Sequence, residues 1–229
     1  MKEIAPYTRD FVFVCPDDNC GYRVNGETAP DRCPACGTRN PVMAPGSRGP
    51  LDEFLRSDFV EVPGADCIMA TIPVPQIVWR LVMGHLETPF LGDYLPVVSV
   101  SWKDCVEFLS RLNTLPEATA TGLSFRLPTA AEWKSVAKRG RRKFEELAWY
   151  WDNSGSVPHP VREKTSIRPG FYDLFGNVWE WCSDGDETGN VCLGGCWCCD
   201  EAGCMEEERW PADTRCSFIG FRLCAERNA

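Results

Sequence analysis

Fourteen cysteines in a chain of 229 residues limit what this protein can fold into more than any other feature of its sequence. The four nearest the N-terminus follow the pattern C-x4-C-x12-C-x2-C and are Cys15, Cys20, Cys33 and Cys36. Two pairs of thiolates on tight turns suit tetrahedral Zn(II) or Fe(II), and four thiolates close the coordination sphere of a structural site. A segment this short cannot bury a useful core, so we expect the metal to supply its folding free energy.

Two disulfides are the alternative interpretation of these four cysteines. The N-terminal sequence MKEIAPYTRD has no apolar stretch of the kind found in secretory signals, which favours a reducing compartment and hence the metal.

The formal net charge of −9 argues against a general nucleic-acid binder, because phosphate contacts need a basic face. No apolar run approaches the ~18 residues needed to span a bilayer, so we expect no membrane insertion.

The N-terminal segment resembles the rubredoxin-like zinc ribbons. Its first cysteine pair departs from their usual C-x2-C spacing, so zinc and iron both stay open. The residues that follow, up to residue 58, are rich in glycine, proline and charge. We therefore expect a zinc ribbon over residues 1–40, a linker over residues 41–58 and a second domain over residues 59–229.

The second domain is expected to begin with two short strands, within residues 58–64 and 67–74. Apolar residues then recur at helical spacing and predict helices over residues 75–84, 102–113 and 130–140. Beyond residue 141 the chain consists of turns, short strands and tryptophans. Helices followed by a long, irregular, β-rich half indicate an α+β domain that is rich in loops.

Local signals mark the ends of these helices. Ser101 with Asp104, and Thr129 with Glu132, have the spacing of capping boxes. Gly140 is expected to end the third helix. The apolar face of the first helix is expected to consist of Ile77, Val78, Leu81 and Val82.

Six segments of the second domain carry a family resemblance. They are PVVSVSWKDCVEFLSRLN, FRLPTAAEWKSVAKRG, AWYWDNSG, FYDLFGNVWEWCSD, LGGCW and IGFRL, in that order. Together they resemble the formylglycine-generating enzyme, or sulfatase-modifying factor, family over about residues 59–226. The resemblance implies a C-type-lectin-like fold. It does not imply an activity, because many members of the family bind ligands and catalyse nothing.

The catalytic members of this family hold Cu(I) between two cysteines and oxidise a substrate cysteine to formylglycine. The resemblance places Cys199 and Cys204 at the matching positions, and two soft thiolates suit Cu(I). Three features depart from the family pattern: Cys196 replaces a serine, Phe218 replaces an asparagine, and MEEE at residues 205–208 replaces basic and aromatic residues. These changes weigh against the oxidase, which we keep as the alternative function.

The family also binds Ca(II) around the GNVWEW turn. The matching residues here are Asp173, Gly176, Val178 and Glu180, whose oxygen atoms suit a hard cation. A carboxylate-capped turn without an ion is equally open. Relatives that form sulfoxides use a histidine-rich helix, and this chain has two histidines, neither in such a motif.

The C-terminal part of the chain resembles the variable proteins of diversity-generating retroelements, which belong to the same family. In those proteins a fixed backbone frame presents solvent-facing side chains to a ligand. We therefore expect a non-catalytic domain that binds a protein or peptide, and the acidic balance favours a basic partner. Because no secretory signal is seen, we expect a cytoplasmic or phage-particle-associated protein. The expected ligand-binding residues are Cys198, Cys199, Asp200, Glu201, Glu206, Trp210, Asp213, Ser217 and Phe218.

Overall fold

The computed structural model describes residues 11–14, 23–26, 42–43, 49–168 and 170–228, and the chain divides into two compact units, Met1–Glu53 and Phe54–Ala229. In the first unit an antiparallel sheet has the strand order β2-β1-β3. Its strands are β1 (Phe11–Val14), β2 (Arg23–Gly26) and β3 (Val42–Met43). All four N-terminal cysteines lie outside the described residues, so their metal site stays a prediction.

The linker expected over residues 41–58 contains regular structure. Strand β3 pairs with β1, and helix α1 covers Pro50–Ser57. Phe54 and Leu55 of this helix are buried. Among the glycines, prolines and charges of this segment, Leu51, Phe54 and Leu55 form an apolar stripe at helical spacing, which explains the helix.

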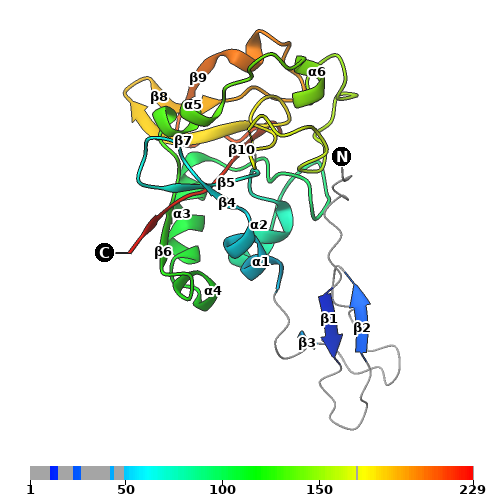
Figure 1. Cartoon of the computed structure of the whole chain (residues 1–229), viewed down its shortest axis with the longest axis vertical. Coiled ribbons are helices and arrows are strands. Elements are labelled where there is room, and N and C mark those ends of the chain that lie inside the picture. The colour runs from blue at the N-terminus through cyan, green and yellow to red at the C-terminus, as the bar shows by residue number, and fades with distance from the viewer. Residues whose placement is uncertain (1–10, 15–22, 27–41, 44–48, 169, 229) are drawn as a thin grey trace. The chain divides into compact units, whose positions relative to one another are not determined.

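The second unit contains two four-stranded sheets (Figure 1). One is antiparallel, in the order β4-β5-β11-β6; its strands are β4 (Phe59–Glu61), β5 (Ile68–Ala70), β6 (Leu123–Arg126) and β11 (Cys224–Arg227). The other has the order β10-β7-β8-β9; its strands are β7 (Trp179–Asp186), β8 (Gly189–Leu193), β9 (Glu207–Trp210) and β10 (Ile219–Phe221). Within the second sheet β10 runs parallel to β7, and the other pairs are antiparallel.

Helices surround these sheets, and their starts agree with the local signals in the sequence. Both predicted capping boxes are confirmed, at the starts of α3 and α5. The third predicted helix is shorter than expected, because α5 ends before the basic run of residues 138–143, where like charges one turn apart disfavour a helix. The helical segments are α2 (Gln76–Met83), α3 (Trp102–Leu112), α4 (Pro116–Thr119), α5 (Ala130–Val136), α6 (Phe144–Leu147) and the short 3-10 helix η1 (Gly203–Met205).

The apolar face expected for the first of these helices is partly wrong. Ile77 and Val78 are buried, but Leu81 is 51% exposed. Trp79 is buried instead, where it stacks on Phe108 of α3 with the ring centroids 5.3 Å apart. The packing of α2 against α3 therefore turns the helix toward the tryptophan, since an aromatic ring buries more area than a leucine.

A buried ion pair ties the two sheets together. Arg222 follows β10, and its guanidinium donates two hydrogen bonds of 2.6 Å to the carboxylate of Glu180 in β7. The same guanidinium also donates to the carbonyl oxygen of Ala70 in β5. Among the helices that the structure describes, none is long and apolar enough to cross a membrane.

Candidate functional site

The segment from Gly194 to Cys204 joins β8 to η1 and holds four cysteines. Both glycines have positive φ, 99° at Gly194 and 71° at Gly195, a region that favours glycine. A Cβ on Gly195 would lie 2.4 Å from the Cα of Cys204, so no other residue fits there. The double glycine therefore folds the chain directly back over Cys204.

The four thiols of this segment, which we call the thiol chain, consist of Cys196, Cys198, Cys199 and Cys204. The Sγ atom of Cys196 lies 3.2 Å from the Sγ atoms of both Cys198 and Cys199. The Cys204 thiol donates to the carbonyl oxygen of Cys196 at 3.9 Å and also interacts with Cys199. Cys196 and Cys204 are buried, whereas Cys198 and Cys199 are half-buried. The structure thus brings the predicted copper pair together and adds two thiols to it.

The thiol chain has one preferred site for negative charge. Hydrogen bonds from the thiols of Cys196 and Cys204 hold the pKa of Cys199 well below its usual range, and the Trp179 side chain adds a further hydrogen bond. The pKa values of Cys196 and Cys204 are raised, because their interaction with Cys199 and their burial both disfavour the charged form. Cys199 is therefore the most acidic thiol of the chain of four.

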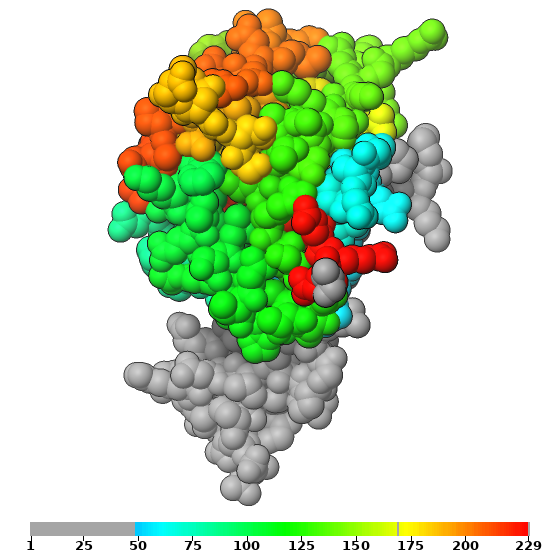
Figure 2. Space-filling model, turned by 90° about the vertical axis from the view of Figure 1, so that its left-hand side faces the viewer, coloured from blue at the N-terminus to red at the C-terminus, as the bar shows by residue number. Residues whose placement is uncertain are grey.

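The residues expected to contact a ligand are all accessible. Asp200, Glu201, Glu206 and Asp213 are exposed, and the remaining five of the nine are half-buried. Trp210 packs edge-to-face on Trp179, with ring centroids 5.5 Å apart, and also contacts Phe218. Figure 2 shows the segment around residue 200, in orange, on the surface at one end of the domain.

The predicted calcium residues fit a cation at one carboxylate only. Asp173 is buried, its Oδ2 accepts a hydrogen bond from the backbone N–H of Arg162, and its Oδ1 has no partner among the described residues. Burial raises the pKa of Asp173 to about 6. Both oxygens of Glu180 are instead occupied, by Arg222 and by the indole N–H of Trp133. The carboxylate of Glu180 is thus already neutralised by a cation from the chain itself.

A second cluster, which the sequence did not reveal, joins Cys67, Cys224 and Glu132. Their ligand atoms all lie within 4.8 Å of one another, and the Cys67 thiol donates to Glu132 at 3.4 Å. Glu132, however, accepts two hydrogen bonds from Arg126, at 2.7 and 2.8 Å, and one from the backbone N–H of Thr129. A metal ion would have to compete with the guanidinium for these oxygens, so we assign the cluster to the start of α5.

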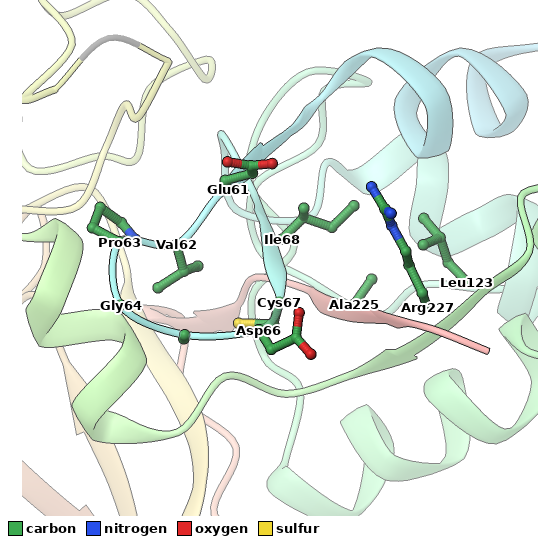
Figure 3. A pocket seen from close by; sticks show the side chains of 11 residues that line it. Glu61, Val62, Pro63, Gly64, Asp66, Cys67, Ile68, Leu123, Ala225 and Arg227 are labelled. Atoms are coloured by element: carbon green, nitrogen blue, oxygen red, sulfur yellow. The ribbon is translucent and has the colours of Figure 1, made fainter. Parts of the chain in front are cut away.

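This second cluster borders a pocket of about 670 Å³ (Figure 3). The turn from Glu61 to Ile68 forms one wall, and Leu123, Ala225 and Arg227 form the other. Figure 3 shows the sulfur of Cys67 on the pocket side of this turn. The two cysteines are far apart in sequence and come together only because β11 pairs with β5.

Several further residues belong to the core. Cys105, Trp179 and Trp181 are buried. The imidazole of His159 stacks on Trp149 with ring centroids 3.7 Å apart, which is a packing role. All ten cysteines that the structure describes are free thiols.

Comparison with known families gives the domain its assignment. A family model described as "Sulfatase-modifying factor enzyme 1-like domain" matches residues 52–227. The chain belongs to this family. A second model, "Rubrerythrin, rubredoxin-like domain", matches residues 13–40, which confirms the resemblance of the N-terminal segment and indicates a metal-binding module there.

Curated relatives of this sulfatase-modifying-factor-like chain include both enzymes and an inactive protein. The formylglycine-generating enzyme of Thermomonospora curvata is 28% identical over 72% of this chain and 69% of its own length. The chaperone protein LppX of Paenibacillus barcinonensis is 27% identical, over 52% of this chain and 62% of its own length. The inactive C-alpha-formylglycine-generating enzyme 2 of Mus musculus is 28% identical, over 56% of this chain and 46% of its own length. The chain thus spans about half to two thirds of these relatives.

Solved structures confirm the expected fold of this family member. Variable protein 1 of Treponema denticola superposes with a TM-score of 0.60 at 23% identity, covering 74% of this chain and 98% of that one. PvdO from Pseudomonas aeruginosa superposes with a TM-score of 0.58 at 17% identity, covering 96% of this chain and 92% of that one. At these identities the likeness supports the C-type-lectin-like fold and leaves the activity open.

Proposed function

We propose that the second domain binds a protein or peptide ligand through its C-terminal face, without forming formylglycine. One observation carries this proposal: none of the nine expected contact residues is buried. Three residues of the backbone frame that holds them, Cys196, Cys204 and Ile219, are at most 1% exposed. Accessible side chains on a rigid backbone are the arrangement that ligand-binding loops use.

The proposed face combines an aromatic centre with acidic surroundings. Trp210 is held by neighbouring aromatic rings, so little side-chain entropy is lost when it contacts a partner. Glu201 pairs with Arg139 and Asp213 with Lys103, whereas Glu206 is exposed and has no ion pair within the described part of the chain. A ligand with basic residues around an apolar contact is the complementary partner.

A peptide selection tests this proposal. Peptides from a random displayed library that bind the full chain are measured against Trp210→Ala, Glu206→Lys and the control Glu117→Lys, an exposed residue of α4. We expect basic peptides whose affinity falls at least tenfold with either face variant and does not change with the control. Binding should also weaken with added salt. Peptides that bind all three variants equally would contradict the proposed face; circular dichroism checks that each variant is folded.

The copper oxidase remains a second candidate because Cys199 and Cys204 lie close enough to interact. Two adjacent soft thiols are a fitting donor set for Cu(I), and these two residues would hold it. In related enzymes the ion supplies the oxygen chemistry. The contribution of this chain would be to keep Cys199 as a thiolate and Cys204 buried beneath it.

A titration separates the two candidates. Cu(I) is added to the reduced chain and to its Cys199→Ala variant, and mass spectrometry follows conversion of a substrate-peptide thiol to an aldehyde under oxygen. Tight stoichiometric binding that needs Cys199, with aldehyde formed, would establish the oxidase. Weak binding, or binding that does not depend on Cys199, without product, supports a ligand-binding domain.

Two finer metal assignments belong to the same proposal. We propose zinc at the N-terminal module, ligated by Cys15, Cys20, Cys33 and Cys36, since four thiolates are a common ligand set of structural zinc and the matched family is rubredoxin-like. Metal analysis of the purified chain distinguishes zinc from iron. A calcium ion near Asp173 would satisfy its unpartnered oxygen, and a rise in the thermal midpoint on adding Ca(II) would support it.

A further inference from the structure

The first three members of the thiol chain lie on one tight turn. Residues 196–199 read Cys-Trp-Cys-Cys, so Cys196 and Cys199 have C-x-x-C spacing. The backbone N–H of Cys199 donates to the carbonyl oxygen of Cys196 at 3.0 Å, the hydrogen bond that closes a four-residue turn. Such a turn brings its end Cα atoms within about 7 Å, and a disulfide needs a separation of about 4.4–6.8 Å.

The sulfur atoms are already close to bonding distance. The Sγ atoms of Cys196 and Cys199 lie 3.2 Å apart, against about 2.05 Å in a disulfide. Small side-chain rotations would close the gap without moving the frame of the turn. The double glycine before Cys196 and the buried Cys204 beneath it fix that frame.

The two thiols differ in access. Cys196 is 1% exposed, whereas Cys199 is half-buried. An accessible thiol beside a buried one is the arrangement of a nucleophile and a resolving cysteine.

We propose that Cys199 and Cys196 form a redox-active dithiol that reduces accessible disulfides by thiol–disulfide exchange. The thiolate of Cys199 attacks one sulfur of the substrate disulfide, forms a mixed disulfide and releases the other sulfur as a thiolate. Cys196 then loses its proton to the released thiolate and attacks the Sγ atom of Cys199, which frees the second substrate thiolate. Two electrons pass from the dithiol to the substrate, and a low-molecular-weight thiol reduces the new Cys196–Cys199 disulfide again.

Two neighbouring cysteines have secondary roles in this exchange. Cys204 is a positioning residue, because its buried thiol has no access to a substrate and donates to the carbonyl oxygen of Cys196 at 3.9 Å. The Sγ atom of Cys198 is as close to Cys196 as that of Cys199 is, so Cys198 competes for the disulfide. A disulfide between Cys196 and Cys199 would also remove Cys199 from the pair that could hold Cu(I).

This thiol–disulfide exchange is separate from the proposed ligand binding and does not depend on it.

The experiment uses the full chain in metal-chelated buffer. The wild type, Cys196→Ser, Cys199→Ser and the control Cys216→Ser, a half-buried cysteine outside the thiol chain, react with an aromatic disulfide reagent. Peptide mapping by mass spectrometry locates every product bond. We expect a Cys196–Cys199 disulfide in the wild type and a trapped mixed disulfide at Cys199 in Cys196→Ser. The rate of the fast phase of reaction with the reagent should fall at least tenfold in Cys199→Ser. In Cys216→Ser this rate should stay within twofold of the wild type.

Two outcomes would overturn the inference. One is a fast phase that survives in Cys199→Ser; the other is a wild-type product without a bond between Cys196 and Cys199, and mapping the wild type needs no variant to fold. Loss of peptide binding in the face variants with exchange intact would count against the proposed ligand-binding function alone. Intact peptide binding without exchange would count against the dithiol alone.

Discussion

At the scale of single residues, the chemistry of the C-terminal face depends on which hydrogen bonds reach Cys199. Its sulfur accepts from two thiols and also interacts with Trp179, a concentration of donors that a lone surface cysteine lacks. These neighbouring groups lower the pKa of the Cys199 thiol, which matters for binding a partner, a cation or a disulfide. Replacing one of them should therefore change the pKa of Cys199 although Cys199 itself is not substituted.

Cys204→Ala should raise the pKa of Cys199, because one hydrogen bond to the thiolate is lost. A hydrogen bond to a charged group is worth about 1.5–3 kcal/mol, which corresponds to an upward shift of roughly 1–2 pH units. The pH dependence of alkylation at Cys199, followed by peptide mapping, measures this shift. Cys204→Ser keeps a donor and should titrate closer to the wild type; equal curves for both variants would contradict the assignment.

The buried pair of Glu180 and Arg222 makes a second prediction at this scale. Arg222→Met leaves the carboxylate of Glu180 buried with only the Trp133 indole as donor, and should lower the free energy of unfolding by about 3–5 kcal/mol. Denaturant unfolding measures the loss. The double variant Glu180→Gln with Arg222→Met should recover part of it, because no uncompensated charge remains; a double variant as unstable as the sum of both singles would argue against this account.

At the scale of elements, the start of α5 links local and distant structure. Glu132 caps the helix through the backbone N–H of Thr129, binds Arg126 at the end of β6 and accepts from Cys67 beside β5. The carboxylate of Glu132 thus connects α5 to β6 and to the start of β5, two strands of the sheet β4-β5-β11-β6. The sequence predicts the cap, which is local, but not the two cysteines, which meet only in the folded sheet.

Stability at low pH should report on this carboxylate. Hydrogen bonds from Arg126 lower the pKa of Glu132 from 4.5 to about 2, so its contribution is complete above pH 4.5 and is lost as the pH falls toward 2. Glu132→Gln should therefore be less stable than the wild type by about 2–3 kcal/mol at neutral pH, with the gap closing near pH 2. Denaturant unfolding across this range measures the gap. Glu187→Gln, at an exposed turn, should show no such pH dependence.

At the scale of the whole molecule, the sequence identifies the fold through its motifs and misses what depends on tertiary packing. The helix starts at Ser101 and Thr129 follow from residues three positions apart and are predictable. The burial of Trp79 in place of Leu81 depends on which neighbour α2 meets, and periodicity alone does not contain that information. Of the thiol chain, the family resemblance predicts the pair Cys199 and Cys204. That Cys196 lies next to Cys199 follows only from the folded turn of residues 196–199.

The division into two compact units predicts separate responses to metal loss. Replacing Cys33 and Cys36 with serine should abolish metal binding by the N-terminal module, because two of its four expected ligands are gone. The main thermal transition of the second unit should move by no more than about 2 °C. Metal analysis and calorimetry measure the two effects. A large fall in the main transition would show that the units depend on each other.

The position of β11 has a consequence for how the chain is synthesised. The last strand lies between β5 and β6, about 150 residues downstream of β5. On a ribosome that adds about 5–20 residues per second, β5 therefore waits many seconds with one edge unpaired. An open edge is the part of a nascent chain that aggregates or recruits a chaperone. Translation speed and chaperone supply should thus govern the yield of this domain, while the N-terminal module is complete long before.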